Sequence, residues 1–203
     1  MDSAANQQQE DLVRQAQQGC HSAFTRLVEL HREAVLSYLL VRCGQNDRER
    51  AEDITQETFL KAWTNILDVD NPAGFRAWLL TIARNKLYND QRWRKSRPFI
   101  SFDRLLDKIG DHLPRPYRSP DPTETYPEQA QVMDVLQQMP ESLSEPLILS
   151  KGFQMNSIEI GEVMELTPVA VRTRIHRAEQ MFRTLQQADE RKMEVNADAL
   201  PRM

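Results

Sequence analysis

A group of hydrogen-bond donors near the carboxyl end of the chain marks the first candidate functional surface. The group consists of Arg172, Thr173, His176 and Arg177, and Gln180 follows it by one helical turn. In a helix that advances by about 100° per residue, these side chains share one face. They can donate hydrogen bonds to base edges and phosphates, so they predict a DNA-reading helix.

The opposite face of the same segment is apolar. Its stripe, at spacings of four and three, consists of Val171, Ile175, Ala178, Phe182 and Leu185. We expect this stripe to be buried. We expect the helix to start after Thr167, because a threonine oxygen can accept from a free helical amide and Pro168 loses no hydrogen bond at the first position.

A second short helix is expected just before it. Asn156 is a candidate N-cap, and Glu159 completes a capping box three residues later. Gly161 lets two helices cross closely, so the pair predicts a helix-turn-helix. The pattern alone leaves open an ordinary helical hairpin whose basic face is solvated.

A second candidate DNA surface lies in the segment 75–93. Its first half places Phe75, Trp78, Leu79 and Ile82 on the buried face, and its second half is rich in amides and cations. The candidates in that second half are Asn85, Lys86, Asn89 and Arg92, with Tyr88 and Trp93 interleaved. Amides, cations and aromatic rings together suit unpaired bases. The alternative is a helix end that runs into solvent.

A third candidate surface lies on the helix expected at residues 47–66. Its inward stripe consists of Ala51, Ile54, Thr58, Ala62 and Ile66. The outward side carries Asp53, Gln56, Glu57 and Leu60. A leucine among carboxylates is a patch that a partner protein can cover, although single exposed leucines are also common.

The charge of the chain is unevenly distributed. The 203 residues include 26 basic and 30 acidic side chains, a net charge of −4. Residues 72–98 nevertheless carry seven basic and one acidic side chain, and residues 166–185 carry four and one. Two basic islands in an acidic protein predict two DNA contacts with weak affinity for DNA as a whole.

Several classes of function are disfavoured by the sequence. No stretch approaches about 18 consecutive apolar residues and the amino end lacks an apolar run, so we expect no membrane span, no signal peptide and a cytoplasmic protein. Cys20 and Cys43 are too few for a zinc site or a disulfide framework. The four histidines have no partners at metal spacing, and no phosphate loop or nucleophile motif occurs. We therefore predict no catalytic residues, no metal, no cofactor and no enzymatic activity.

The pattern of apolar residues predicts an all-α protein of two small helical domains. Besides the helices above, we expect helices at 10–18, 22–43 and 128–139, and residues 1–9 without structure. A capping box of Ser142 and Glu145 should open a buried helix that continues to Lys151. The proline-rich segment 96–127 is expected to be a flexible linker with one short helix at residues 102–109.

Two separated segments resemble the extracytoplasmic-function sigma factors, the smallest group of bacterial RNA polymerase sigma subunits. Their region 2 is similar to AEDITQETFLKAW at residues 51–63, followed by GFRAWLLTIARNKLYND at residues 74–90. Their region 4 is similar to MPESLSEPLILSKGF at residues 139–153, with LTPVAVRTRIHRAEQMF at residues 166–182. Two independent motifs in this order and at this separation make the resemblance specific.

The resemblance implies region 2 at residues 10–95, a linker at 96–127, region 4 at 128–186 and a tail at 187–203. It implies that the outward face of the acidic helix, from Asp53 to Leu60, docks on the coiled coil of the polymerase β′ clamp. The basic helix, with Asn85, Lys86, Asn89, Arg92 and the loop at residues 70–74, would read the −10 promoter element. The region 4 helix would place Arg172, Thr173, His176 and Arg177 in the major groove of the −35 element.

The same resemblance implies further partners. In this family region 4 also binds the β flap, for which residues 132–149 offer an apolar surface, and an anti-sigma factor commonly covers these faces. Glu165 departs from the family pattern, because the turn between the two helices often carries glycine there. The residues alone leave open a different function, an autonomous helix-turn-helix regulator, but such proteins usually bind as dimers and no dimerisation element is evident.

Overall fold

The computed structural model describes residues 2–43, 47–96 and 127–198, and throughout these ranges the regular elements are helices, which confirms the all-α prediction. The predicted linker helix at residues 102–109 lies outside the described residues. In chain order the elements are α1 (Asp2–Gln17), α2 (His21–Cys43), α3 (Arg48–Thr64), the 3₁₀ turns η1 (Ile66–Asp68) and η2 (Pro72–Gly74), α4 (Phe75–Ser96), α6 (Pro127–Gln138), α7 (Glu141–Leu147), the π-helical turn η3 (Ile148–Gly152), α8 (Ser157–Met164) and α9 (Pro168–Asp198).

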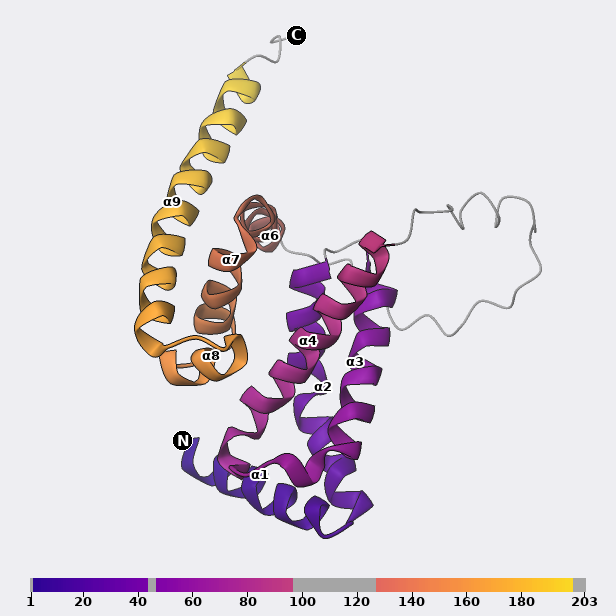
Figure 1. Ribbon diagram of the computed structural model, residues 1–203. Coiled ribbons are helices and arrows are strands. Elements are labelled where there is room, and N and C mark those ends of the chain that lie inside the picture. Colours follow the sequence, from indigo (N-terminus) through magenta and orange to yellow (C-terminus); the bar gives the residue numbers. More distant parts are fainter. Residues whose placement is uncertain (1, 44–46, 97–126, 199–203) are drawn as a thin grey trace, which may run out of the picture.

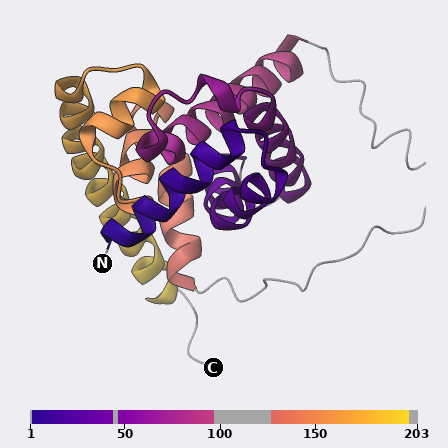
Figure 2. The same cartoon turned by 90° about the horizontal axis from the view of Figure 1, so that it is seen from below.

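The N-terminal half, α1–α4, is a helical bundle. In Figure 1 helices α2, α3 and α4 stand side by side, and α1 crosses one end of them. The view from below in Figure 2 shows α1 lying over that end. The predicted inward stripe of α3 is buried, because all five of its members lie in the bundle interior. The most deeply buried large side chains of this bundle include Leu27, Tyr38, Leu39, Phe75 and Leu79.

Helix α1 begins earlier than predicted, because residues 2–9 belong to it. Gln9 is buried, and its Nε2 donates to the carbonyl oxygens of Pro72 at 3.2 Å and Ala73 at 3.3 Å. One face of α1 also buries Val13 and Ala16. Such tertiary contacts stabilise a polar helical segment that would not hold in isolation.

The C-terminal half, α6–α9, contains the predicted helix-turn-helix. Asn156 caps α8 in a full capping box with Glu159, and the Ala170 amide donates to Thr167 Oγ1 at 3.3 Å at the start of α9. Glu165 takes the left-handed conformation with φ of 56°, so the turn keeps the backbone that glycine often supplies. A Cβ atom on Gly161 would lie 2.6 Å from the carbonyl oxygen of Leu166, which explains the need for glycine there.

The capping box predicted for Ser142 and Glu145 is wrong. Helix α7 begins at Glu141 after Pro140, which makes no side-chain cap, and Pro146 lies inside the helix rather than in its first turn. The π-helical turn η3 follows directly. Glu145 is only 1 % exposed and points into the interface between the two halves, where tertiary partners replace the local cap.

The two halves pack against each other through a continuous apolar core. Figure 1 places α7 and α8 beside α4. Ile148, Leu149, Phe153 and Met155 join the same buried cluster as the interior of α1–α4. Polar contacts also cross this boundary, because Arg42 of α2 pairs with Glu141 and the Arg76 guanidinium donates to the carbonyl oxygen of Phe153 at 2.8 Å.

Candidate functional site

The predicted DNA-reading face of α9 is exposed. Val171 and Ala178 are fully buried on the inner side, and Ile175, Phe182 and Leu185 are partly buried behind them. The outer side presents Arg172, Thr173, His176 and Arg177, all of which are exposed. Local hydrogen bonds hold two of these side chains, because Arg172 donates to Ser157 Oγ at 3.3 Å and His176 Nε2 lies 3.1 Å from Gln180 Nε2. Helix α9 therefore presents a row of hydrogen-bond donors to solvent, while its inner side packs on the core.

The candidate residues of α4 divide between two directions. Asn85, Asn89 and Arg92 are exposed and share one face at spacings of four and three. Lys86 points toward α3, where its Nζ pairs with Glu57 Oε2 at 2.8 Å. Three of the four predicted residues therefore form one surface, and Lys86 links that helix to the acidic face of α3.

The turn before α4 is ordered by side chains from two sides. The Asn71 side chain accepts from the Ala73 amide at 3.2 Å, and Gln9 of α1 donates to the carbonyl groups of Pro72 and Ala73. Gln17 adds donations to the carbonyl oxygens of Ile66 at 3.2 Å and Val69 at 2.9 Å. Helix α1 thus holds the whole connection between α3 and α4 in place.

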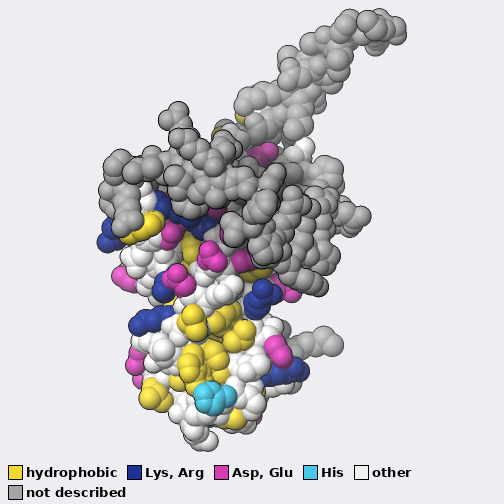
Figure 3. All heavy atoms as spheres, turned by 90° about the vertical axis from the view of Figure 1, so that its right-hand side faces the viewer, with side chains coloured by type: hydrophobic (Ala, Val, Ile, Leu, Met, Phe, Trp, Pro, Cys, Tyr) yellow, Lys and Arg dark blue, Asp and Glu magenta, His cyan; other side chains and the backbone are white. Residues whose placement is uncertain are grey.

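The outward face of α3 borders an apolar hollow. Asp53, Gln56, Glu57 and Leu60 are exposed, and the Leu60 side chain is 68 % exposed. The hollow has a volume of about 470 Å³, and its apolar lining comes from Phe24, Val28, Phe59, Leu60 and Trp63. Figure 3 shows hydrophobic side chains gathered on this side of the molecule, with a histidine at their edge. Two of the lining rings pack on each other, because the ring centroids of Trp63 and Phe24 lie 4.9 Å apart.

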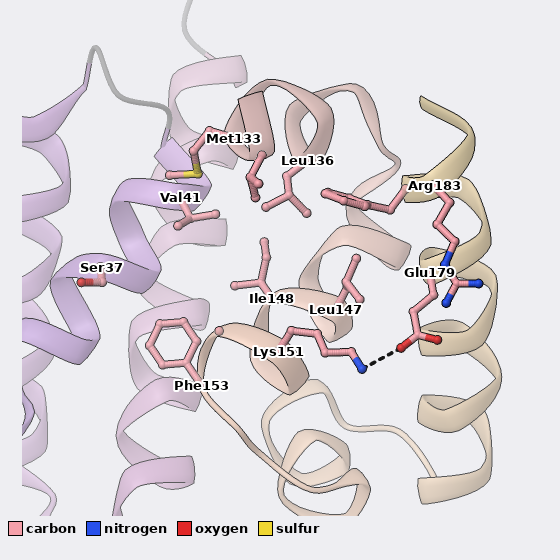
Figure 4. Close-up of a pocket in the computed structure, with 13 residues that line it drawn as sticks. Ser37, Val41, Met133, Leu136, Leu147, Ile148, Lys151, Phe153, Glu179 and Arg183 are labelled. Carbon is pink, nitrogen blue, oxygen red and sulfur yellow. Dashed lines mark ion pairs between the residues drawn. The ribbon is translucent and has the colours of Figure 1, made fainter. Parts of the chain in front are cut away.

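A second apolar groove lies where the two halves meet. It has a volume of about 620 Å³ and lies between α2, α6, η3 and α9. Figure 4 shows Val41, Met133, Leu136, Leu147 and Ile148 around it. An ion pair of 2.8 Å between Lys151 and Glu179 lies at its border. Such a groove suits the apolar side of a partner segment.

Sequence reasoning missed the polar cluster in the interface between the halves. Glu145 Oε1 accepts from Tyr38 Oη at 2.6 Å and from Arg84 Nε at 3.1 Å, while Oε2 accepts from Tyr88 Oη at 3.1 Å. The Arg84 guanidinium also stacks over the Tyr88 ring at 4.6 Å. A carboxylate that directly precedes the apolar run of residues 146–149 was the available signal, because such a position implies burial with partners.

Burial controls the ionisation of the two tyrosines. Burial first, and then the neighbouring Glu145 charge, raise the pKa of Tyr38 well above its ordinary value. The same two causes raise the pKa of Tyr88. Both phenols are therefore protonated at neutral pH and can donate to the carboxylate.

Within residues 2–43, 47–96 and 127–198, no group of three or more His, Cys, Asp and Glu side chains is placed to hold a metal ion. None of the helices described there is both long enough and apolar enough to span a membrane.

The two halves match two parts of one protein family. The match to Sigma-70 region 2 covers residues 27–98, and the match to Sigma-70, region 4 covers residues 129–181. The RNA polymerase sigma-H factor of Pseudomonas aeruginosa is 32% identical over 176 residues, which cover 85% of this chain and 90% of that protein. The chain is an extracytoplasmic-function sigma factor of the sigma-70 family. The helix-turn-helix described above therefore lies in region 4, and the bundle of α2–α4 lies in region 2.

Other relatives agree with this sigma factor in sequence and fold. The RNA polymerase sigma factor CnrH of Cupriavidus metallidurans is 30% identical over 187 residues, covering 89% of this chain and 95% of that protein. A structure of CnrH in complex with the cytosolic domain of CnrY has a TM-score of 0.65 at 27% identity and covers 90% of this chain and 99% of that one. RpoE from Bartonella quintana, solved with the anti-sigma factor NepR, shares the fold with a TM-score of 0.61 at 20% identity, over 82% and 98% of the two chains.

Proposed function

We propose that this sigma factor binds core RNA polymerase with α3 and reads promoter DNA with α4 and α9, while it performs no chemistry of its own. The observation that carries the proposal is the exposure of three separate faces, each of which gathers side chains of the kind its partner requires. A sigma factor is a promoter-specific transcription initiation factor. Because it works on RNA polymerase, we place it in the bacterial cytoplasm.

The polymerase contact is assigned to α3. Asp53, Gln56 and Glu57 offer acceptors around an exposed leucine, and the apolar hollow lies beside them. An exposed apolar side chain next to a concave apolar surface, ringed by polar groups, has the anatomy of a protein interface. The β′ clamp coiled coil is the partner that this face would take.

The −10 element is assigned to the exposed side of α4 with the turn before it. Asn85 and Asn89 can read the polar edge of an unpaired base, and Arg92 can neutralise a phosphate. Lys86 supports this surface less directly, because it pairs with Glu57. Gln9 donates to two carbonyl groups of the turn at residues 70–74, which supports the assignment of this turn as one wall of a base pocket.

The −35 element is assigned to α9. Arg172 and Thr173 lie near its start, and His176 and Arg177 lie one turn further. The first turns of the second helix of a helix-turn-helix contact base edges in the major groove. Arg172 and Arg177 are exposed, and their long cationic side chains suit guanine edges or phosphates.

The groove between the halves is assigned to protein partners. Its α6 and α7 walls fall within residues 132–149, the surface expected to contact the β flap. Solved relatives carry CnrY or the anti-sigma factor NepR. We propose that an anti-sigma factor also holds this chain and competes there with polymerase.

A reconstitution experiment tests the proposal. The purified chain, mixed with core RNA polymerase, should comigrate with it on a sizing column and support transcription from a promoter mapped by RNA 5′ ends. Failure to form the complex would contradict it. Tight sequence-specific binding of the chain alone to duplex DNA would instead favour an autonomous regulator, a function that is not favoured because both sigma regions match.

A further inference from the structure

Glu145 lies in the C-terminal half, yet its three described partners all lie in the N-terminal half. Tyr38 belongs to α2, and Arg84 and Tyr88 belong to α4. The carboxylate is 1 % exposed, and the side chain of Arg84 is 17% exposed. A buried carboxylate is tolerated only with such partners, so Glu145 favours the arrangement in which the two halves meet.

The partners of Glu145 form an anion site on the N-terminal half. A guanidinium and two phenol groups converge on the carboxylate with donor distances of 2.6 to 3.1 Å. Arginine held by stacking on an aromatic ring is pre-organised for carboxylate and phosphate oxygens alike. Without Glu145 the site would present a positive charge and hydroxyl donors with no acceptor.

This anion site adjoins the proposed −10 surface. Arg84 directly precedes Asn85, and Tyr88 directly precedes Asn89 on the same helix. We propose that Glu145 locks the two halves of the free chain together by filling this anion site, and that the site takes a nucleic-acid phosphate once the halves separate. The lock stands without the proposed function, whereas the phosphate contact rests on it.

The lock predicts a defined shape change in solution. Small-angle X-ray scattering of the full-length chain should give a compact particle for the wild type. Glu145→Gln removes the charge that Arg84 requires, so its radius of gyration should increase and its distance distribution should broaden. Asp134→Asn makes the same charge change at an exposed position of α6 and should leave the scattering unchanged.

A second, milder variant separates loss of the lock from misfolding. Tyr88→Phe removes one hydroxyl from a half-buried side chain and should shift the scattering in the same direction by a smaller amount. Far-UV circular dichroism checks that each variant keeps its helical content. If both variants keep their helices and remain as compact as the wild type, or if the wild type is already extended, the lock is wrong.

The phosphate contact is tested with a mixed-sequence single-stranded oligonucleotide and the full-length chain. Fluorescence anisotropy should show several-fold tighter binding for Glu145→Gln than for wild type or Asp134→Asn. Adding Arg84→Gln to Glu145→Gln should remove that gain. An open Glu145→Gln variant whose affinity does not depend on Arg84 would overturn the phosphate contact alone. If the complex of the chain with polymerase also fails to bind promoter DNA, the proposed function is wrong. The scattering result then still tests whether Glu145 holds the two halves together.

Discussion

At the scale of single residues, Glu145 and His31 show two different ways in which a polar side chain is buried. The Glu145 carboxylate oxygens accept hydrogen bonds from Arg84 and from two tyrosines. His31 is buried against the Phe75 ring, with centroids 5.4 Å apart, and its Nε2 has no described partner. Burial, and then the nearby charge of Arg76, lower the pKa of His31 to about 4.

His31 should make the fold sensitive to mild acid. Unfolded histidine binds a proton below about pH 6.5, whereas the folded side chain resists protonation until about pH 4, so stability falls as pH drops through that window. The loss should reach about 2–3 kcal/mol at pH 4.5. The free energy of unfolding of His31→Leu, measured with urea at pH 7 and pH 4.5, should fall by about that much less than the free energy of unfolding of the wild type. Exposed His176→Leu is the control, and an equal acid response in both variants would contradict the prediction.

The arginines of α9 are expected to carry promoter affinity. Arg172→Ala or Arg177→Ala should weaken binding of the polymerase complex to its promoter by about 1–3 kcal/mol, because a lost base or phosphate contact costs that much. Filter binding or anisotropy measures the change. Arg26→Ala, which removes an exposed arginine from α2, should have no effect. Full affinity in both α9 variants would remove these residues from the DNA contact.

The sequence predicted residue roles well where the signals are local. The Asn156 cap and the Thr167 cap depend on neighbours within one turn, and both were confirmed. The predicted stripe of α9 is buried at Val171 and Ala178 and partly buried at its other three members. The role of Glu145 depends on partners 107, 61 and 57 residues away. A helical pattern in one segment carries no information on such pairs, so the local capping box was the wrong choice.

At the scale of elements, the helix-turn-helix depends on a close crossing. A Cβ at Gly161 would lie 2.6 Å from the backbone carbonyl oxygen of Leu166. A backbone atom cannot relieve such a clash by a change of rotamer, as the end of a flexible side chain can. Gly161→Ala should therefore destabilise the C-terminal half by about 1–3 kcal/mol, as overpacking does. Thermal unfolding measures the loss. Gly152→Ala adds a Cβ with no atom within 4 Å and should be neutral, so equal effects of the two changes would contradict the crossing argument.

The exposed face of α3 should tolerate charge in the free chain. Leu60→Asp should abolish binding to core polymerase while helical content and melting temperature stay unchanged, because Leu60 is 68 % exposed. Leu30→Asp, at another exposed leucine on α2, is the matched control and should bind normally. Co-purification with core polymerase is the measurement. Normal binding by Leu60→Asp, or its unfolding, would show that Leu60 is not an interface residue.

Helix positions were easier to predict than helix lengths. Both stripes of α3 and the two helices of the helix-turn-helix follow from apolar spacing. The first turns of α1 did not, because a polar segment such as residues 2–9 is held by contacts with a turn more than 60 residues away. The contact between the two halves could likewise not be predicted from the sequence pattern of either half alone.

At the scale of the whole molecule, region 2 and region 4 share one core. Phe153 belongs to that core and lies edge-on to Tyr38, with ring centroids 6.1 Å apart, and under the Arg76 guanidinium. Its side chain is only 8 % exposed. The two halves should therefore unfold together, although each is a helical unit with its own buried stripe.

Phe153→Ala should uncouple that joint unfolding. Removing a buried phenylalanine costs about 3–5 kcal/mol, and here the loss falls on the contact between the halves. Calorimetry should show one transition for the wild type and two for the variant. A single transition at a lower temperature would show that the halves remain coupled without Phe153, and it would contradict the prediction.

The amide side chains of α1 have a consequence for DNA capture that involves no DNA contact. Gln9 and Gln17 fix the connection at residues 66–74 when the chain folds. The conformational entropy of that connection is then already lost before a DNA strand arrives, so its ordering does not reduce binding affinity. Helix α1 thereby orders this connection in advance, and a truncation that removes α1 should weaken the −10 contact proposed above.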